Sequence, residues 1–364
     1  MKILTELLNH FEKIIDVDRI IRNEHELEAC LRFEKISRPI FAAAYAQEEY
    51  TPFPIPEIHA DMEKMLYNEL LGCLPSFEES DGGIPMIRAN YGVGTLASLF
   101  GMESYFTGND MPWVRHVKST DAIRGLISRG VPNLKTGFGA RVLETYEYYM
   151  DVLSKYENLY NGIKLYHADL QGVFDTAHLI AGPEIYTLMY DEPELIHNLL
   201  KLVAQTYIAY LKEHFKIADG LTADGNCYHW GSVYGGAVLI RNDSAVNLSP
   251  AMYKEFIRPY DEEILSAFGG GTIHFCGRAD QWIFDMIKTK NLKTLNFGWM
   301  GKYEFGQNYL DFLKQALDDS HISVGGYTIT TADIETFDFK KYSTGVHFKI
   351  AAENKRETMD ILDR

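Results

Sequence analysis

The sequence contains little cysteine and no long apolar run. Its four cysteines, Cys30, Cys73, Cys227 and Cys276, are scattered over 364 residues, which does not suggest a disulfide framework, so any cysteine chemistry is expected to be that of thiolates. No stretch of about 18 apolar residues occurs, and residues 1–6 lack a signal-peptide pattern. We therefore expect a cytoplasmic protein that does not bind a membrane.

Positive charge and the common nucleotide and hydrolase motifs are also scarce. The chain has 35 Lys and Arg against 51 Asp and Glu, a formal net charge of −16, and such a field repels phosphate backbones. Nucleic acid is therefore excluded as an expected partner. No GxGxxG, P-loop, HExxH or GxSxG pattern is present, so dinucleotide, ATP, metalloprotease and serine-hydrolase functions have no support.

Short apolar segments that end in Gly, Asp or Asn alternate with longer amphipathic segments, and this alternation predicts a parallel sheet. About eight such units favour a closed barrel. No linker or internal repeat interrupts the sequence, so we predict one α/β domain, a (β/α)8 TIM-type barrel over residues 37–364. The predicted strands are residues 39–44, 84–90, 163–169, 220–224, 272–276, 292–296, 322–325 and 346–350.

Three segments show helix signals. Residues 193–203 repeat apolar positions at three and four residues, with Pro193 in the first turn, as expected of a helix outside a barrel. Ser249 followed by Pro250 is typical of a helix start. Residues 1–36 are predicted to form an N-terminal helical extension, which either caps the barrel or faces a second copy in a homodimer; the sequence leaves both open.

His274 and Cys276 form the most informative pair in the chain. They are two residues apart on a predicted strand, so both side chains point to the same face. Gly277 then ends the strand, which places them at a carboxyl end, where α/β folds keep their chemistry. An imidazole and a thiolate form half of a tetrahedral zinc site. On the pair alone a structural interpretation is the more common one, because free cysteines are usually buried and inert.

Other polar residues are predicted to gather at the same rim. Asp169 and Asp224 end two predicted strands and are candidate catalytic residues, as proton carriers or as groups that orient ligands, with turn capping as the alternative. Residues 224–236 are predicted to form a pocket wall, with packing under neighbouring segments as the alternative. The candidate substrate-binding residues are Tyr91, Asn226, His229, Trp230 and Tyr234. Cys227, with His229, is a candidate to complete the zinc site, whereas residues 242–244 are interpreted as polar turn chemistry.

Several of these segments together resemble the uroporphyrinogen decarboxylase superfamily, which includes corrinoid-dependent methyltransferases. The matching segments are residues 171–182, 191–194, 247–260 and 272–277, and the resemblance is best over residues 160–300. It implies a single (β/α)8 barrel with a metal at the carboxyl rim. In the methyltransferase branch, the positions of His274 and Cys276 are zinc ligands.

The sequence departs from both branches of this superfamily. Residues 38–56 do not contain the arginine-rich motif with which the decarboxylase branch binds acidic porphyrin side chains, so haem-pathway decarboxylation is not expected. The methyltransferase branch has a further Cys ligand near the C-terminus, and no Cys follows Cys276. Cys227, His229 or His347 would have to replace it, or the metal is absent.

Two hypotheses follow. The first is a zinc-dependent methyltransferase that moves a methyl group between a methylated donor, with a corrinoid on a partner protein as a candidate, and a thiol. The second keeps the barrel without the metal, as a decarboxylase or lyase for a small or tetrapyrrole acid, or as a binding protein. A metal held by His274 and Cys276 would separate them.

Overall fold

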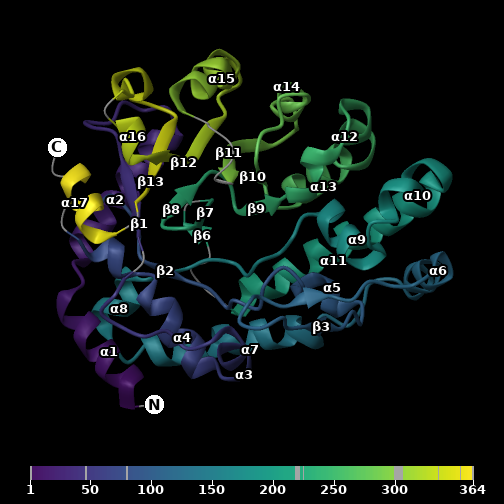
Figure 1. Ribbon diagram of the computed structural model, residues 1–364, viewed down its shortest axis with the longest axis horizontal. Helices are drawn as coiled ribbons and strands as arrows, with labels where there is room; N and C mark the ends of the chain where they lie inside the picture. The colour runs from purple at the N-terminus through teal and green to yellow at the C-terminus, as the bar shows by residue number, and fades with distance from the viewer. Residues whose placement is uncertain are drawn as a thin grey trace.

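A parallel sheet of six strands organises the fold (Figure 1). The structure is a computed structural model that describes residues 2–45, 47–78, 81–217, 222–223, 225–298, 306–334, 336–352 and 354–362. The sheet order is β1-β13-β12-β11-β10-β9, and every neighbouring pair is parallel. The six strands are β1 Phe41–Ala44, β9 Val238–Arg241, β10 Gly271–Cys276, β11 Leu292–Gly298, β12 Ser323–Thr330 and β13 Val346–Ala351.

A second parallel pair, β2 Met86–Ile87 with β5 Lys164–Leu165, faces the two edges of this sheet. The segments before β2 and after β5 contact the two edge strands. The backbone N–H of Gly82 donates to the carbonyl of Phe41 in β1. Gln171 forms an isolated parallel β-bridge with Arg241 in β9. The eight parallel segments therefore follow one another in chain order. The parallel α/β prediction is confirmed, but the ladders between β1 and β2 and between β5 and β9 are not continuous, so a closed barrel is not shown.

The prediction of a barrel strand at residues 220–224 is wrong. Gly220, Leu221 and Asp224 lie outside the described residues, and β6 Thr222–Ala223 is the edge of an antiparallel meander with β7 Asn226–His229 and β8 Ser232–Tyr234. Trp230 and Gly231, between β7 and β8, both have positive φ, at 45° and 83°. Such a pair forms a tight hairpin turn, so the chain folds back on itself and β9 becomes the next strand of the parallel set.

Helices lie along the outside of the parallel strands, with the meander between the sheet and the β2–β5 pair (Figure 1). The small antiparallel pair β3 Ser104–Tyr105 and β4 Trp113–Val114 lies among them. The helices are α1 Lys2–Ile14, α2 Val17–Leu31, α3 Ile55–Ala60, α4 Met62–Leu71, α5 Thr95–Leu99, α6 Thr120–Arg129, α7 Gly137–Leu153, α8 Glu157–Gly162, α9 Val173–Ala181, α10 Ile185–Asp191, α11 Pro193–Ile217, α12 Pro250–Phe256, α13 Arg258–Ala267, α14 Ile283–Met286, α15 Gly306–Ser320, α16 Thr331–Ile334 and α17 Lys355–Leu362.

The helix signals of the sequence are confirmed. Helix α11 begins at Pro193, and the hydroxyl of Ser249 caps α12 by accepting from the N–H of Met252. The N-terminal segment forms α1 and α2, and α2 packs against the meander. Tyr228 donates to Glu24, and Asn226 donates to Glu28 at 3.4 Å. Helix α2 therefore covers the meander, while the boundary at residue 36 and a homodimer stay predictions.

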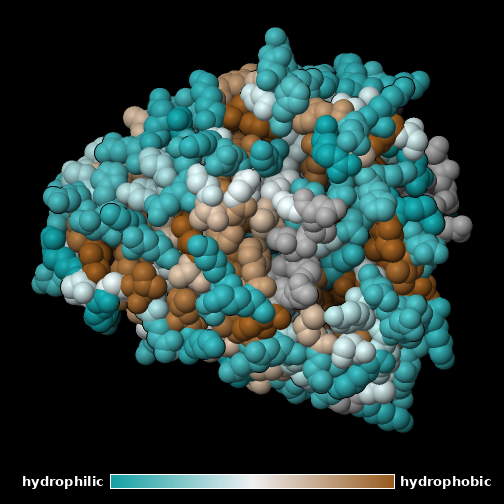
Figure 2. Space-filling view, turned by 180° about the vertical axis from the view of Figure 1, so that it is seen from behind, coloured by the Kyte–Doolittle hydropathy of each residue, from teal (hydrophilic) through white to brown (hydrophobic). Residues whose placement is uncertain are grey.

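Within the described residues, no helix has the length and apolar character needed to cross a membrane. Figure 2 shows one face of the molecule, on which hydrophilic residues predominate and hydrophobic residues form several separate patches.

His214, on α11, provides a test of the core. It is fully buried against Tyr146, with ring centroids 4.4 Å apart, and neither ring nitrogen has a hydrogen-bond partner among the described residues. Burial lowers its pKa from 6.5 to about 3. Its neutral form therefore contributes stability that is complete above pH 6.5 and is lost as the pH falls toward 3, by at most about 1.4 kcal/mol per pH unit.

We expect His214→Phe to unfold with a shallower pH dependence than the wild type between pH 6.5 and 4, because Phe keeps the ring contact and cannot bind a proton. Urea unfolding at several pH values measures this slope. Equal slopes for the two proteins would show that His214 is not held neutral by burial.

Candidate metal centre

Strands β10 and β11 place alternate side chains on the inner face of the sheet. His274 pairs in register with Asn296, and Cys276 pairs with Gly298. Because side chains alternate along a strand, His274 and Cys276 share this face with Asn296. The predicted common face of His274 and Cys276 is thus present at the carboxyl end of β10.

Asp243, His274 and Cys276 form a cluster whose possible ligand atoms all lie within 4.8 Å of one another. The Nε2 atom of His274 is 3.4 Å from Oδ1 of Asp243 and 3.5 Å from Sγ of Cys276. The N–H of Cys276 also donates to Oδ1 of Asp243 at 2.9 Å. Nitrogen, sulfur and carboxylate oxygen are the three ligand types that zinc takes in proteins. The donor set therefore fits a zinc ion.

The tautomer of His274 leaves the correct nitrogen free. The side-chain amide of Asn296 donates to the carbonyl of Gly325 at 2.6 Å, which assigns its oxygen to the opposite side. This oxygen accepts from Nδ1 of His274. In the neutral form of the ring, which is the form that binds a metal, the proton is thus on Nδ1 and the Nε2 lone pair faces Asp243 and Cys276. Metal-binding histidines are usually fixed in this way through their other ring nitrogen.

The charges of the cluster also favour a cation. Burial raises the pKa of Asp243, but the hydrogen bond and the positive charge that a protonated His274 ring supplies outweigh burial, and the pKa lies below its ordinary value. Burial and the Asp243 carboxylate raise the pKa of Cys276. A metal ion binds the thiolate form of Cys276. The positive charge of the ion would lower the pKa of the thiol, against the effects of burial and of the Asp243 carboxylate.

Gly298 has no side chain, and this leaves room for the side chains of Cys276 and His274. A Cβ atom at this position would lie 2.6 Å from Sγ of Cys276 and 3.0 Å from Cε1 of His274.

We expect Gly298→Ala to weaken zinc binding by about 10-fold or more, because the positions of the two ligands must shift. Titration of zinc against a chelating dye measures the change. Gly125→Ala on α6 is the control, since its Cβ meets nothing closer than 3.5 Å, and unchanged zinc affinity in Gly298→Ala would contradict the geometry.

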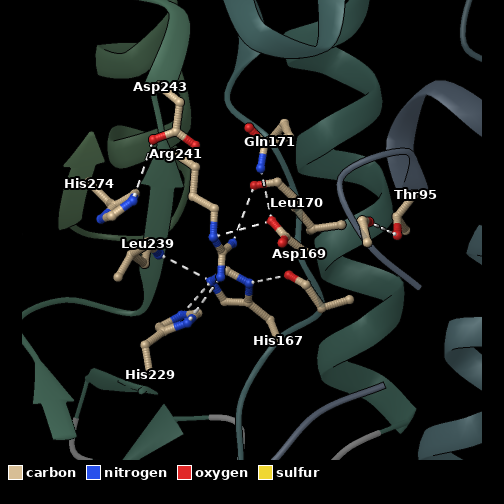
Figure 3. Close-up of polar contacts among 12 residues, drawn as sticks. Thr95, His167, Asp169, Leu170, Gln171, His229, Leu239, Arg241, Asp243 and His274 are labelled. Atoms are coloured by element: carbon tan, nitrogen blue, oxygen red, sulfur yellow. Dashed lines mark hydrogen bonds and ion pairs between the residues drawn. The ribbon is translucent and has the colours of Figure 1, made fainter. Parts of the chain in front are cut away.

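Arg241, at the end of β9, connects the cluster to the meander (Figure 3). It is 2% exposed, and its Nε lies 3.3 Å from Oδ1 of Asp169. Asp169 also pairs with Arg88 at 3.5 Å. Burial raises the pKa of Asp169, but these two guanidinium groups outweigh it and lower the pKa below its ordinary value. Asp169 is therefore an ionised group that orients Arg241, which does not favour a role as a proton donor.

His167 and His229 form a buried neutral pair below Arg241 (Figure 3). Nδ1 of His167 donates to the carbonyl of Ala168, so its Nε2 accepts from His229 at 3.0 Å and from the N–H of Leu239 at 3.2 Å. Burial lowers the pKa of both rings. His229 is fully buried in these contacts, so it holds the meander against β9 and is not presented to a ligand.

Trp230, at the hairpin turn, lies between the cluster and a cavity. Its ring centroid is 4.8 Å from that of His274, and the guanidinium of Arg241 is 5.1 Å from the Trp230 centroid. Trp230 and Gly231 also line a cavity of about 460 Å³. Of the predicted pocket wall, residues 224–236, only the turn residues Trp230 and Gly231 are among the residues that line this cavity.

The remaining predicted residues lie away from the cluster. Cys227 was expected as the third metal ligand, but it is fully buried in a small apolar cluster with Tyr234 and Leu239, because β7 turns its side chain toward β8 and β9. His347 is occupied by Ser232, Val233 and the N–H of Gly326. Asp224 lies outside the described residues.

Three of the predicted substrate-binding residues, Tyr91, Asn226 and Tyr234, do not line the cavity either. Tyr91 donates to or accepts from Thr145 and packs on His59 and Phe138. Asn226 lies at the other end of β7 from Trp230. Tyr234 supports the cluster from below, where its hydroxyl accepts from the Asn296 amide at 3.3 Å.

Asp243 is a candidate metal ligand that was not predicted from the sequence. Its neighbourhood was interpreted as turn chemistry, and it does start a 3-10 helix, Asp243–Asn247. The signal that could have found it is the run Val238–Arg241, which is a strand of four buried residues that ends two positions earlier. A carboxylate directly after such a strand belongs to the same rim as His274.

Comparisons with known proteins give one sequence relationship and one fold relationship. The chain is 28% identical over 184 residues to uroporphyrinogen decarboxylase from Xanthomonas campestris pv. campestris, a match that covers 46% of this chain and 42% of that protein. It is 29% identical over 186 residues to the same enzyme from Xanthomonas euvesicatoria pv. vesicatoria, covering 49% and 45%. The match thus spans less than half the length of these curated relatives. No family model matches the chain.

A methyltransferase from Methanosarcina mazei has a similar structure, with a TM-score of 0.64, 14% sequence identity and coverage of 94% of this chain and 97% of that one. This likeness shows the fold. Together, the comparisons confirm the resemblance to the uroporphyrinogen decarboxylase superfamily, in sequence to the decarboxylases and in fold to a methyltransferase.

Proposed function

We propose that this protein is a zinc-dependent methyltransferase that transfers a methyl group between a methylated donor and a thiol. The observation that carries the proposal is the cluster of Asp243, His274 and Cys276 at the carboxyl end of the parallel strands. The methyltransferase fold of the Methanosarcina mazei protein supports the same class. A protein-bound corrinoid is the donor that we propose, from the resemblance to the corrinoid-dependent branch.

Asp243, His274 and Cys276 would hold the zinc ion, which when bound would lower the pKa of an acceptor thiol and keep it as a thiolate. The chain's own residues prepare that site. Asn296 holds the proton of His274 on Nδ1, and Asp169 orients Arg241 beneath the cluster. Trp230 covers one side of His274 with an aromatic ring and limits the access of water.

The test uses methylcobalamin as donor and 2-mercaptoethanol as acceptor, with zinc-loaded protein. We expect the wild type to form methyl thioether. The rate of formation should fall at least about 100-fold in His274→Ala, since this variant loses one ligand of the zinc ion that would position the thiol. His321→Ala is the control, because His321 is not part of the Asp243–His274–Cys276 cluster. Product formation that is equal in wild type and His274→Ala would contradict the proposal.

A second candidate is a metal-free decarboxylase or lyase for a small or tetrapyrrole acid. The observation that favours it is the sequence similarity to the Xanthomonas decarboxylases. Decarboxylation of such an acid by protein freed of metal, with no loss in His274→Ala, would support this candidate against the first.

A further inference from the structure

The cavity beside Trp230 has the dimensions of a small-molecule site. Its volume is about 460 Å³, within the range of roughly 300–1,000 Å³ that ligand pockets occupy. Apolar and aromatic side chains form much of its wall, including Met86, Tyr166 and Trp230. Because Trp230 also contacts His274, the cavity lies one aromatic side chain away from the Asp243–His274–Cys276 cluster.

Lys349 brings a positive charge into this cavity. It is two residues after His347 on β13, and His347 contacts Ser232 of the meander on the inner face. Alternation along the strand therefore turns Lys349 inward as well, and it lines the cavity. Within the described part of the chain, the ammonium group has no hydrogen-bond or ion-pair partner. Burial lowers its pKa, as expected for a cation without a counter-charge.

Two other polar side chains of the wall, Glu69 and Asn68, are already engaged. Glu69 accepts a hydrogen bond from the N–H of Arg88 at 2.9 Å. Asn68 both donates to and accepts from the backbone of Phe53, each at 2.8 Å. Among the described lining residues, Lys349 is thus the cation that is left without a partner, and a ligand with one negative charge would match it.

We propose that this cavity binds a small carboxylate, whose charge pairs with Lys349 and whose apolar part packs against Trp230. One ammonium group suits a monoanionic carboxylate better than a phosphate, which proteins usually hold with several donors, an arginine fork or a helix N-terminus. The binding itself is independent of the metal. Only its role as the substrate subsite rests on the proposed function.

The test compares phenylacetate with phenylacetamide, which has the same shape and no charge, by isothermal titration calorimetry at pH 7. We expect the wild type to bind phenylacetate at least about 10-fold more tightly than the amide, a difference that corresponds to about 1.4 kcal/mol. Lys349→Met should remove this preference, and Lys349→Arg should restore part of it. Lys288→Met, on the exposed surface, is the control and should bind as the wild type does.

Three results would overturn the proposal: no binding of phenylacetate by the wild type, equal affinity for acid and amide, or unchanged preference in Lys349→Met. Inorganic phosphate is tested in competition, and tighter binding of phosphate than of phenylacetate would also overturn it. Zinc content of each variant is measured in parallel. Because Lys349 is not in the metal cluster, lost carboxylate binding with retained zinc separates the failure of this proposal from the failure of the proposed function.

Discussion

Replacing Asp243 by Ala is expected to weaken zinc binding on the order of 100-fold or more, since removal of even an outer partner of a metal ligand typically costs about 10- to 100-fold. The carboxylate lies 3.4 Å from Nε2 of His274, on the side where Cys276 also faces. Asp243→Asn should lose less affinity, because the amide oxygen can still accept from the N–H of Cys276. Competition with a chelating dye measures each dissociation constant.

Two control variants make this result specific. Asp280→Ala removes the same charge from an exposed ion pair with Arg278 and should leave zinc affinity unchanged. Cys227→Ala should also leave it unchanged, because Cys227 packs in an apolar cluster. If Cys227→Ala lost the metal and Asp243→Ala kept it, the sequence-based ligand set would be right and the structural one wrong.

Arg241→Met is expected to lower the free energy of unfolding by about 3–5 kcal/mol, the usual cost of removing one partner of a buried ion pair. Arg241 is 2% exposed, and it contacts Asp169, His229 and Trp230. Its loss leaves the buried carboxylate of Asp169 with Arg88 alone. Chemical unfolding followed by circular dichroism measures the change.

Lys155→Met is the matched control for Arg241→Met. Lys155 and Asp151 form an exposed pair, with 61% and 69% of their side chains accessible, and such pairs contribute at most about 1 kcal/mol. Adding Asp169→Asn to Arg241→Met should recover part of the lost stability, because the uncompensated charge is removed. A loss below about 1 kcal/mol in Arg241→Met would mean that the buried pair does not hold β9 to the segment after β5.

The residues that the sequence predicted well are those on regular strands. Strand β10 runs over Gly271–Cys276, and a period of two suffices to place His274 and Cys276 on one face. The same reasoning located β1, β11, β12 and β13 to within a few residues. Local pattern and local geometry agree in these segments.

The meander shows why the rest could not be predicted. Residues 220–224 were predicted to form a barrel strand, whereas the buried parallel strand β9, Val238–Arg241, was not predicted. Only the tertiary structure decides which of these segments joins the parallel set. Without β9, Asp243 is not recognised as a residue that follows a parallel strand, and residues 242–244 were interpreted as polar turn chemistry.

Of the residues that line the cavity, Trp230 was predicted from the sequence and Lys349 was not. Lys349 gave no signal, because a single lysine in a strand is usually solvated. Its place inside the cavity follows from the register of β13 with β1 and β12. Pairings between segments that are about 300 residues apart in the sequence carry no local pattern.

The proposed zinc site is tested by the metal content of protein purified without an affinity tag, measured by elemental analysis beside Asp243→Ala, His274→Ala and Cys276→Ser. We expect about one zinc per chain in the wild type and its loss in all three variants, since the three ligands share one ion. A wild-type protein that contains no metal and takes up none from added zinc would contradict the proposed zinc site and leave the cluster of Asp243, His274 and Cys276 as a hydrogen-bonded part of the core.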